Sequence, residues 1–103
     1  MTKRVTVIGG GPVGATLACM LAKRGFAVEI YERRPDMRSD QAAGGRSINL
    51  VLTTRGLRAL KDLGLFDEVM ALTAPVAGRQ MHALDGALTY QAYGKTGECN
   101  HSI

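Results

Sequence analysis

The chain has 103 residues, of which 46% are hydrophobic and 21% are charged, and its formal net charge is +4. Its mean hydropathy is −0.01, and no apolar run approaches the ~20 residues of a membrane span, so the composition predicts a soluble, cytoplasmic protein. The Lys and Arg residues are scattered, without a basic run or interleaved aromatic residues. This pattern argues against a nucleic-acid partner.

Cysteine and histidine spacing argues against a metal site. Cys19 falls inside a predicted helix, Cys99 lies near the end of the chain, and neither forms a CxxC or HxxxH pattern with His82 or His101. The sequence therefore predicts no bound metal. It also predicts two isolated thiols, in packing or incidental roles, in a reducing compartment.

Residues 5–32 have the order of a dinucleotide-binding βαβ unit: an apolar strand, a glycine-rich turn, a helix, a second strand and a terminal acid. Gly9 suits the tight turn, Gly11 lets backbone amides approach a pyrophosphate, and Gly14 lets the helix pack closely on the sheet. The start of the helix then points unpaired N–H groups and its positive dipole end at the phosphates. The apolar pattern of the helix runs through Val13, Leu17, Met20 and Leu21.

The acid that ends the second strand predicts a ribose contact. Glu32 follows Gly14 by eighteen positions, and a carboxylate there can accept hydrogen bonds from the ribose hydroxyls of an adenosine group. Arg33 and Arg34 could hold a 2′-phosphate, but Glu32 would repel one, so the turn favours FAD or NAD over NADPH. The motif by itself does not separate FAD from a nicotinamide cofactor.

Beyond the first unit, the sequence predicts short elements that end in a hairpin. In chain order these are a polar loop at 33–46, an extended segment at 47–52, a helix that Thr53 or Thr54 begins and Gly64 ends, a short helix at 67–72, and a β-hairpin formed by 76–84 and 87–93 around Asp85-Gly86. A nicotinamide dehydrogenase normally continues with further βα units. A hairpin in their place favours a flavoprotein hydroxylase.

Several strings in the sequence closely resemble the kynurenine 3-monooxygenases, a family of FAD-dependent aromatic hydroxylases. They are VIGGGPVG, YERRPD, GRSINLVLTTRGLRAL, GRQMHALDG and AYGK, and the most discriminating is GRSINL at 45–50. The resemblance implies an α/β fold of the para-hydroxybenzoate hydroxylase type. This would be a Rossmann-like βαβ FAD-binding domain, incomplete, with a β-hairpin at its C-terminal end.

The resemblance also implies an activity. Residues 1–103 would be the N-terminal part of one FAD-binding domain in a longer flavoprotein monooxygenase, inactive when isolated. The complete enzyme would convert L-kynurenine to 3-hydroxykynurenine, a step of tryptophan degradation and NAD biosynthesis, with O2 and NADPH as co-substrates. The cofactor carries the chemistry, so no catalytic residue is assigned to the chain.

Site residues follow from the same resemblance. The implied cofactor-binding positions are Gly9, Gly11, Val13, Gly14, Tyr31, Glu32, Arg33, Arg34, Arg46 and Val51. The implied contacts to the substrate carboxylate are Arg79 and Tyr93, because a guanidinium binds a carboxylate bidentately and a phenol adds a directional donor. The sequence departs from the family at Ala92, where a proline is usual, and at 96–103, where a more apolar strand is usual.

Three other functions are compatible with the motifs. A related flavin hydroxylase would act on another carboxylated aromatic compound, and a free-standing module would bind a dinucleotide without catalysis. A dehydrogenase linked to NAD or NADP is disfavoured by the lack of further βα units.

Overall fold

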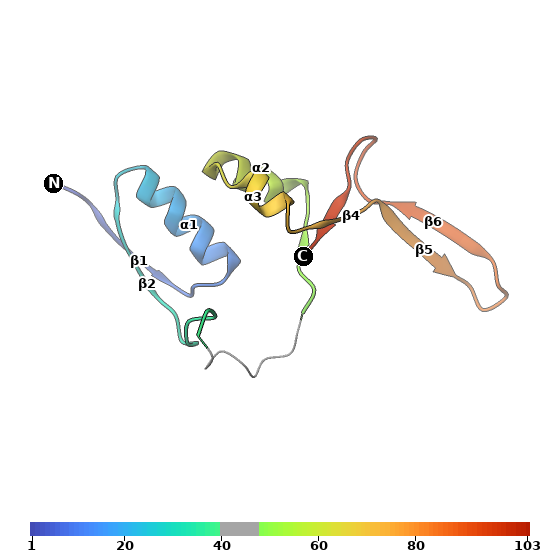
Figure 1. Cartoon of the computed structure of the whole chain (residues 1–103), viewed down its shortest axis with the longest axis horizontal. Helices are drawn as coiled ribbons and strands as arrows, with labels where there is room; N and C mark the ends of the chain where they lie inside the picture. The colour runs from blue at the N-terminus through green and yellow to red at the C-terminus, as the bar shows by residue number, and fades with distance from the viewer. Residues whose placement is uncertain (40–47) are drawn as a thin grey trace. The chain divides into compact units, whose positions relative to one another are not determined.

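The computed structural model describes residues 1–39 and 48–103, and the chain divides into two compact units, Met1–Ser47 and Ile48–Ile103 (Figure 1). We refer to these as unit 1 and unit 2. Among the described residues, no helix has the length and apolar character needed to cross a bilayer. No group of three or more His, Cys, Asp or Glu side chains within these ranges is placed to hold a metal ion.

Unit 1 is the βαβ unit that the sequence predicts. Strand β1 (Arg4–Ile8) leads through the glycine turn into helix α1 (Pro12–Lys23), and β2 (Ala27–Tyr31) returns beside β1 (Figure 1). The two strands are parallel, in register from the pair Arg4 and Ala27 to the pair Ile8 and Tyr31. Because parallel strands need a crossover connection, the helix lies between them in the sequence and their C-terminal ends meet at one edge.

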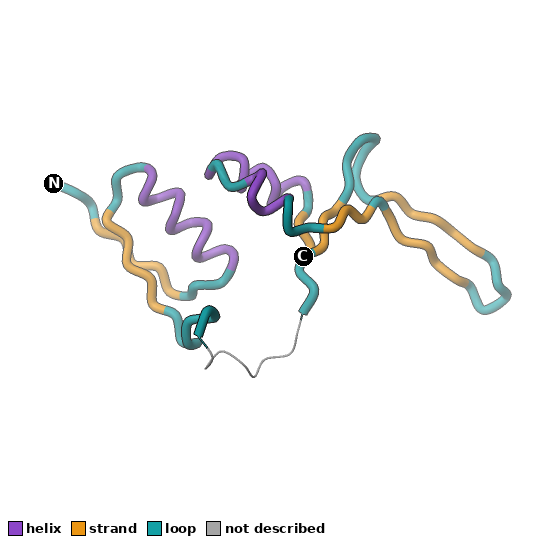
Figure 2. Tube along the Cα trace, in the orientation of Figure 1, coloured by secondary structure: helices purple, strands orange, loops and turns teal. Residues whose placement is uncertain are grey.

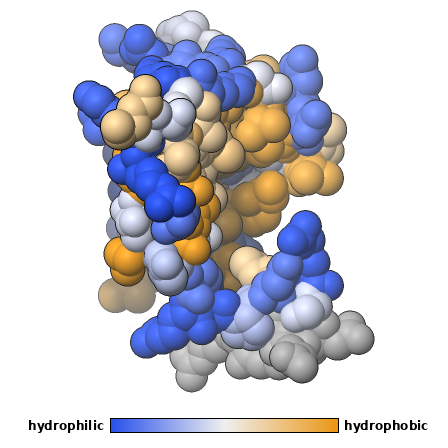
Figure 3. All heavy atoms as spheres, turned by 90° about the vertical axis from the view of Figure 1, so that its left-hand side faces the viewer, coloured by the Kyte–Doolittle hydropathy of each residue, from blue (hydrophilic) through white to orange (hydrophobic). Residues whose placement is uncertain are grey.

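The face of α1 that packs on the strands differs from the predicted apolar pattern. Ala18 is buried against a sheet whose buried residue is Val7. Val13 and Leu17, which belong to the predicted pattern, are 82% and 47% exposed. The small residues on α1 allow the helix axis to lie close to the strands, which leaves larger side chains at the surface. Figure 3 shows hydrophobic residues (orange) at the surface of the molecule.

Unit 2 contains a helical pair and a three-stranded antiparallel sheet. Helix α2 (Thr54–Leu63) follows the N-cap residue Thr53, ends at Gly64 with φ of 73°, and is followed by α3 (Phe66–Met70). The sheet has the order β3 (Val51–Leu52), β7 (Asn100–Ser102), β4 (Ala74–Val76). The predicted face of α2 is confirmed at Leu63, which is buried. Strand β4 begins at Ala74, two residues before residue 76, where the sequence predicts the extended run to begin.

The predicted hairpin is present in unit 2, but it is not the last element. Strands β5 (Gly78–His82) and β6 (Leu88–Ala92) pair antiparallel (Figure 2). At the turn, Gly86 has φ of 88° and the Asp85 carboxylate accepts a hydrogen bond from the Ala87 N–H at 3.0 Å. Strand β7 follows the hairpin and lies at the centre of the other sheet. The expectation of a hairpin at the C-terminal end is therefore wrong, because pairing with β3 and β4 makes a strand of a polar segment.

Candidate functional site

The turn between β1 and α1 has the conformation that a close backbone approach requires. Gly9 has φ of 101°, a region that favours glycine, and its N–H donates to the Tyr31 carbonyl at 2.8 Å. A Cβ at Gly14 would overlap the Gly9 carbonyl oxygen. Gly11 is the N-cap residue of α1, and a Cβ built on it meets no atom within 4 Å. Gly9 and Gly14 are thus required by the fold, whereas Gly11 faces open space.

The start of α1 offers unpaired donors beside this open space. Pro12 occupies the first turn, where a missing N–H costs nothing. The N–H groups of Val13 and Gly14 lie in the same turn and have no intrahelical acceptor by the geometry of an α-helix. With the positive end of the helix dipole, this arrangement suits a phosphate group.

Glu32 lies at the C-terminal end of β2 and is held by two backbone donors. Its Oε2 accepts the Gly10 N–H at 2.7 Å and its Oε1 accepts the Arg34 N–H at 2.9 Å. The Arg34 guanidinium approaches Oε1 at 3.5 Å, and the Glu32 side chain is 30% exposed. Oε2 keeps a second lone pair, so Glu32 can still accept a hydrogen bond from a ligand. Gly10 is a contact that the sequence motif does not reveal.

The same hydrogen bonds lower the pKa of Glu32. The Arg34 N–H, the Gly10 N–H and the charge of Arg34 all favour the carboxylate and hold its pKa below the ordinary value of 4.5. Because the folded pKa lies below the unfolded one, this carboxylate stabilises unit 1 at pH values above 4.5. The stabilisation is lost as the pH falls through the folded pKa.

Glu32→Gln is therefore expected to weaken the acid dependence of stability. The amide keeps one acceptor oxygen but turns an NH2 group toward the second backbone donor, so the variant is also less stable at neutral pH. Urea unfolding at a series of pH values below and above 4.5 measures the effect. Parallel loss of stability with falling pH in the two proteins would contradict the assignment. Asp36→Asn is expected to act in the same direction, since the pKa of Asp36 is also lowered, chiefly by the Arg38 guanidinium.

A surface pocket of about 730 Å³ adjoins Glu32. Its lining residues come from the glycine turn, α1, β2 and the bend that follows β2, and are Gly10, Ala15, Ile30, Glu32, Arg34, Pro35, Asp36, Met37 and Arg38. In the bend, Arg38 Nη2 lies 2.7 Å from Asp36 Oδ2, and Asp36 Oδ1 accepts the Arg38 N–H at 2.9 Å. This pair is not among the predicted site residues. A Pro-Asp sequence after a strand is the turn signal that could have found it.

The remaining predicted cofactor residues fall into separate groups. Tyr31 ends β2 and is 61% exposed, and Arg33 is an exposed residue of the same bend. Val51, in β3 of unit 2, is 53% exposed. Arg46 lies outside the described residues. Unit 1 therefore brings together the glycine turn, Tyr31, Glu32, Arg33 and Arg34.

The hairpin brings the two predicted substrate residues to one face. In the register of β5 and β6, Arg79 lies opposite Gln91, and the Tyr93 N–H continues the ladder to the Ala77 carbonyl at 2.8 Å. Residues directly opposite share a face, so Arg79 and Tyr93 are diagonal neighbours on it. Arg79 Nε donates to Gln91 Oε1 at 2.7 Å. Gln91, which the sequence analysis missed, therefore orients the guanidinium and leaves its terminal nitrogens for another acceptor.

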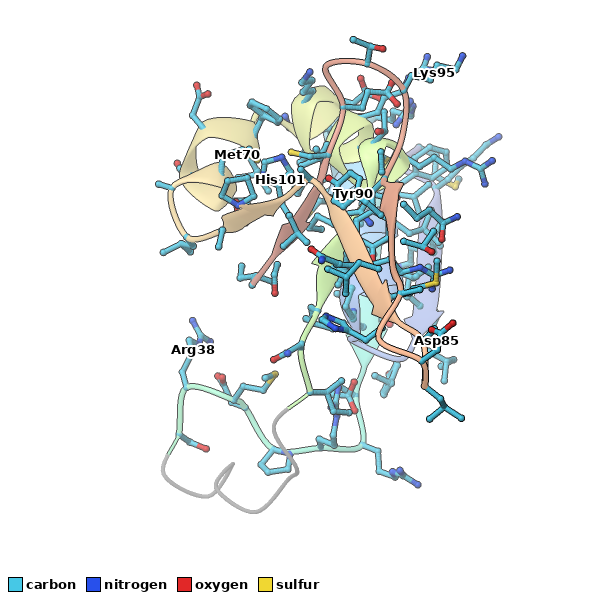
Figure 4. All side chains as sticks on the ribbon, turned by 90° about the vertical axis from the view of Figure 1, so that its right-hand side faces the viewer. Arg38, Met70, Asp85, Tyr90, Lys95 and His101 are labelled. Atoms are coloured by element: carbon cyan, nitrogen blue, oxygen red, sulfur yellow. The ribbon has the colours of Figure 1, made fainter. Side chains whose placement is uncertain are left out.

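The opposite face of the hairpin is occupied by Tyr90, whose ring covers Gly78. A Cβ at Gly78 would lie 2.5 Å from the Tyr90 hydroxyl oxygen. Figure 4 shows Tyr90 along β6 and Asp85 at the tip of the hairpin. Tyr90 thus shields the strand position that has no side chain of its own.

Comparison with known proteins agrees with this geometry. A family model described as an FAD binding domain matches residues 2–97. The chain is 53% identical over 91 residues to a kynurenine 3-monooxygenase of Myxococcus xanthus, covering 88% of this chain and 20% of that protein. It is 44% identical over 105 residues to that of Cytophaga hutchinsonii, covering 100% and 23%. For the Sus scrofa protein the identity is 48% over 90 residues, covering 87% and 19%.

Solved structures show the same fold. The tetrameric form of 2-methyl-3-hydroxypyridine-5-carboxylic acid oxygenase superimposes with a TM-score of 0.79 at 24% identity, over 99% of this chain and 25% of that one. The chain spans about a fifth of the length of the curated relatives it matches. The resemblance to kynurenine 3-monooxygenases predicted from the sequence is confirmed, and the chain belongs to the FAD binding domain family.

Proposed function

We propose that unit 1 binds the ADP half of FAD at the glycine turn. The observation that carries the proposal is Gly11, an N-cap residue beside open space at the start of a 12-residue helix. A pyrophosphate at this position would accept hydrogen bonds from the first-turn N–H groups. Glu32, held at the end of β2 by Gly10 and Arg34, would accept the ribose hydroxyls. The second lone pair of its Oε2, which remains available to a ligand, fits that role.

We further propose that the two units belong to one FAD-binding domain, because a single family model runs through both. Val13 and Tyr31 would flank the pyrophosphate and adenosine, with Arg33 and Arg34 beside the adenosine. Arg46 and Val51 would line the cofactor further along. The exposure of Val13, Tyr31 and Val51 supports a role in contacting a ligand.

Gly11→Ala tests the cofactor site without disturbing the fold. The new methyl group meets no protein atom within 4 Å, and the φ of −70° suits alanine. Alanine is a poorer N-cap than glycine but restricts the unfolded chain, so the stability is expected to change by less than about 1 kcal/mol. The methyl group would stand where the pyrophosphate approaches. FAD affinity, titrated by flavin fluorescence, is therefore expected to fall at least about tenfold.

Gly11→Ser is the matched second variant. Serine restores a favourable N-cap and adds a side chain of similar bulk, so it should be stable and still bind FAD weakly. If both variants bind FAD as tightly as the parent protein, the pyrophosphate does not lie at Gly11 and the site is wrong.

For the complete protein, we propose an NADPH-dependent monooxygenase that hydroxylates L-kynurenine to 3-hydroxykynurenine. When bound, FAD would supply the oxygen-activating chemistry that amino-acid side chains lack. On this chain, Arg79 would bind the substrate carboxylate through its terminal nitrogens, while Gln91 holds its Nε. Tyr93 would add a hydroxyl donor from the same face of the hairpin. Two such contacts would fix the distance of the aromatic ring from the flavin.

The activity is tested on the chain expressed from its complete reading frame. NADPH oxidation is measured with and without L-kynurenine, and the product is identified by mass spectrometry. Stimulated oxidation together with 3-hydroxykynurenine supports the proposal. Oxidation by a yellow protein without that product would overturn the substrate and point to another carboxylated aromatic compound. If the protein binds no flavin, the enzymatic proposal is wrong, and the chain would instead be a non-catalytic dinucleotide-binding module.

A further inference from the structure

A cysteine, a histidine and a threonine form a hydrogen-bonded chain in unit 2. Cys99 Sγ lies 3.5 Å from His101 Nε2, and His101 Nδ1 lies 3.3 Å from Thr73 Oγ1. His101 lies in β7, and Cys99 immediately precedes this strand, two positions from the histidine. The histidine belongs to the central strand of its sheet. We call these three residues the Cys99 cluster.

Thr73 selects the form of the imidazole that faces the thiol. Its hydroxyl has one hydrogen and donates it to the Met70 carbonyl at 3.0 Å, a shorter contact than the one to His101. The hydroxyl oxygen therefore accepts from His101 Nδ1–H, because a neutral imidazole carries one donor and one acceptor. His101 Nε2 is then the acceptor, directed at Cys99. Figure 4 shows Met70 and His101 on this part of unit 2.

This order of groups is the arrangement that activates a nucleophile. A thiol within hydrogen-bond reach of a base, with the base oriented by a third group, is the pattern found in activated cysteines. The thiolate is the reactive form, and an ordinary cysteine is only a few per cent thiolate at neutral pH. All three residues of the cluster are half-buried, so the geometry is supported by packing.

Cys99 lines a pocket of about 430 Å³ that two cationic residues also line. Arg58 and Lys61, one turn apart on α2, line it together with Cys99 and His101. Glu98 is the one acidic residue among the lining residues, and its Oε2 accepts the Lys95 N–H at 3.0 Å. The Lys61 ammonium also lies over the Phe66 ring, 4.7 Å from its centroid. Two cations against one carboxylate among the lining residues leave the pocket with a net positive charge, which favours a small anionic reagent.

We propose that Cys99 is a reactive thiol that forms a mixed disulfide with a small anionic disulfide. His101 Nε2 takes the thiol proton, and the Cys99 sulfur attacks one sulfur of the reagent. The S–S bond of the reagent breaks as the new S–S bond forms. Cys99 is oxidised, and the second half of the reagent leaves as a thiolate that takes the proton from His101. The step needs no flavin, so its test is independent of the cofactor proposal.

The test follows the labelling of individual cysteines in the protein expressed from its complete reading frame. An aromatic disulfide carrying carboxylates is the anionic probe, and an uncharged dipyridyl disulfide is the neutral one. Site-resolved mass spectrometry gives the rate at Cys99 and, in the same sample, at Cys19, which is exposed on α1. If access alone governed the rate, the exposed thiol would react faster. We expect Cys99 to react about tenfold faster than Cys19 with the anionic probe.

Variants separate activation from structure. His101→Gln is expected to remove the advantage of Cys99 over Cys19, and Thr73→Val, which keeps the side-chain shape, to reduce it. Lys61→Gln should slow the anionic probe and leave the neutral probe unchanged. Circular dichroism and urea unfolding verify that each variant is folded, and the Cys19 rate is the internal reference for the reactivity of the probe. If His101→Gln does not fold, Thr73→Val and Lys61→Gln provide the test. Cys99 reacting no faster than Cys19, or unaffected by these substitutions in folded protein, overturns the proposal.

Discussion

Gly14→Ala is expected to unfold unit 1 and abolish FAD binding in the complete protein. The added Cβ would overlap the carbonyl oxygen of Gly9, and neither group is the mobile end of a side chain. Relief requires the helix to move off the strands or the turn to change its conformation. Overpacking of this kind costs about 3 kcal/mol, which is a large share of the stability of a small domain. Chemical denaturation followed by circular dichroism, together with flavin content, measures the effect.

The control for this prediction is another glycine inside a helix. A Cβ at Gly56 in α2 would lie 3.6 Å from Leu52 Cδ2, an ordinary van der Waals contact. Gly56→Ala is therefore expected to stabilise the protein by up to about 1 kcal/mol through helix propensity. If Gly14→Ala and Gly56→Ala change the free energy of unfolding by the same amount, the close approach of Gly14 to the Gly9 carbonyl does not require glycine. Gly11→Ala completes the comparison, because it is expected to impair binding with little effect on stability.

Arg79→Ala is expected to weaken L-kynurenine binding strongly while FAD stays bound. A charge-assisted bidentate contact to the substrate carboxylate contributes about 1.5–3 kcal/mol, so KM should rise roughly ten- to a hundredfold. The residue is exposed on the hairpin and its Nε is held by Gln91, so its removal should not disturb the fold. Steady-state kinetics of NADPH oxidation and the flavin absorbance of the purified protein report the two quantities separately.

Two comparisons show whether the carboxylate is the partner of Arg79. The first uses an analogue in which an amide replaces the amino-acid carboxylate. The parent protein should bind this analogue weakly, and the Arg79→Ala variant should bind it with the same affinity as the parent protein does. Such non-additivity is what a direct contact produces. Lys95→Ala removes a cation from the loop after β6 (Figure 4) and should leave KM unchanged. Equal loss of affinity for the substrate and the amide analogue in Arg79→Ala would place the carboxylate elsewhere.

The elements that depend on local interactions are predictable from the chain. The βαβ unit is one, because the apolar strand, Gly9 with its positive φ and the helix that follows each satisfy a local rule. Helix α2 is another, since Thr53 and Gly64 mark its ends. The Asp85-Gly86 turn of the hairpin follows in the same way. Each of these elements is specified by residues within it or next to it in the sequence, so a local pattern is sufficient to predict it.

Features that depend on distant residues are not predictable in this way. The face of α1 that is buried follows the small residues rather than Leu17, because the strands approach the helix closely. The hydrogen bond from Gly10 to Glu32 joins residues 22 positions apart, and no spacing in the sequence reveals it. The contact between Arg79 and Gln91 depends on the register of the hairpin.

The glycine turn and the acid that follows it are specified locally, because glycine, proline and charged residues at fixed spacings act on the neighbouring backbone. The family is indicated by the resemblance of strings such as GRSINL at 45–50 to the kynurenine 3-monooxygenases. Strand β7 is a polar segment that becomes a strand through its pairing between β3 and β4, with Val51 opposite Ser102. The pairing of β4 with β7 brings Thr73 to His101. Pairing between distant strands depends on the register of the whole sheet, which no local pattern encodes.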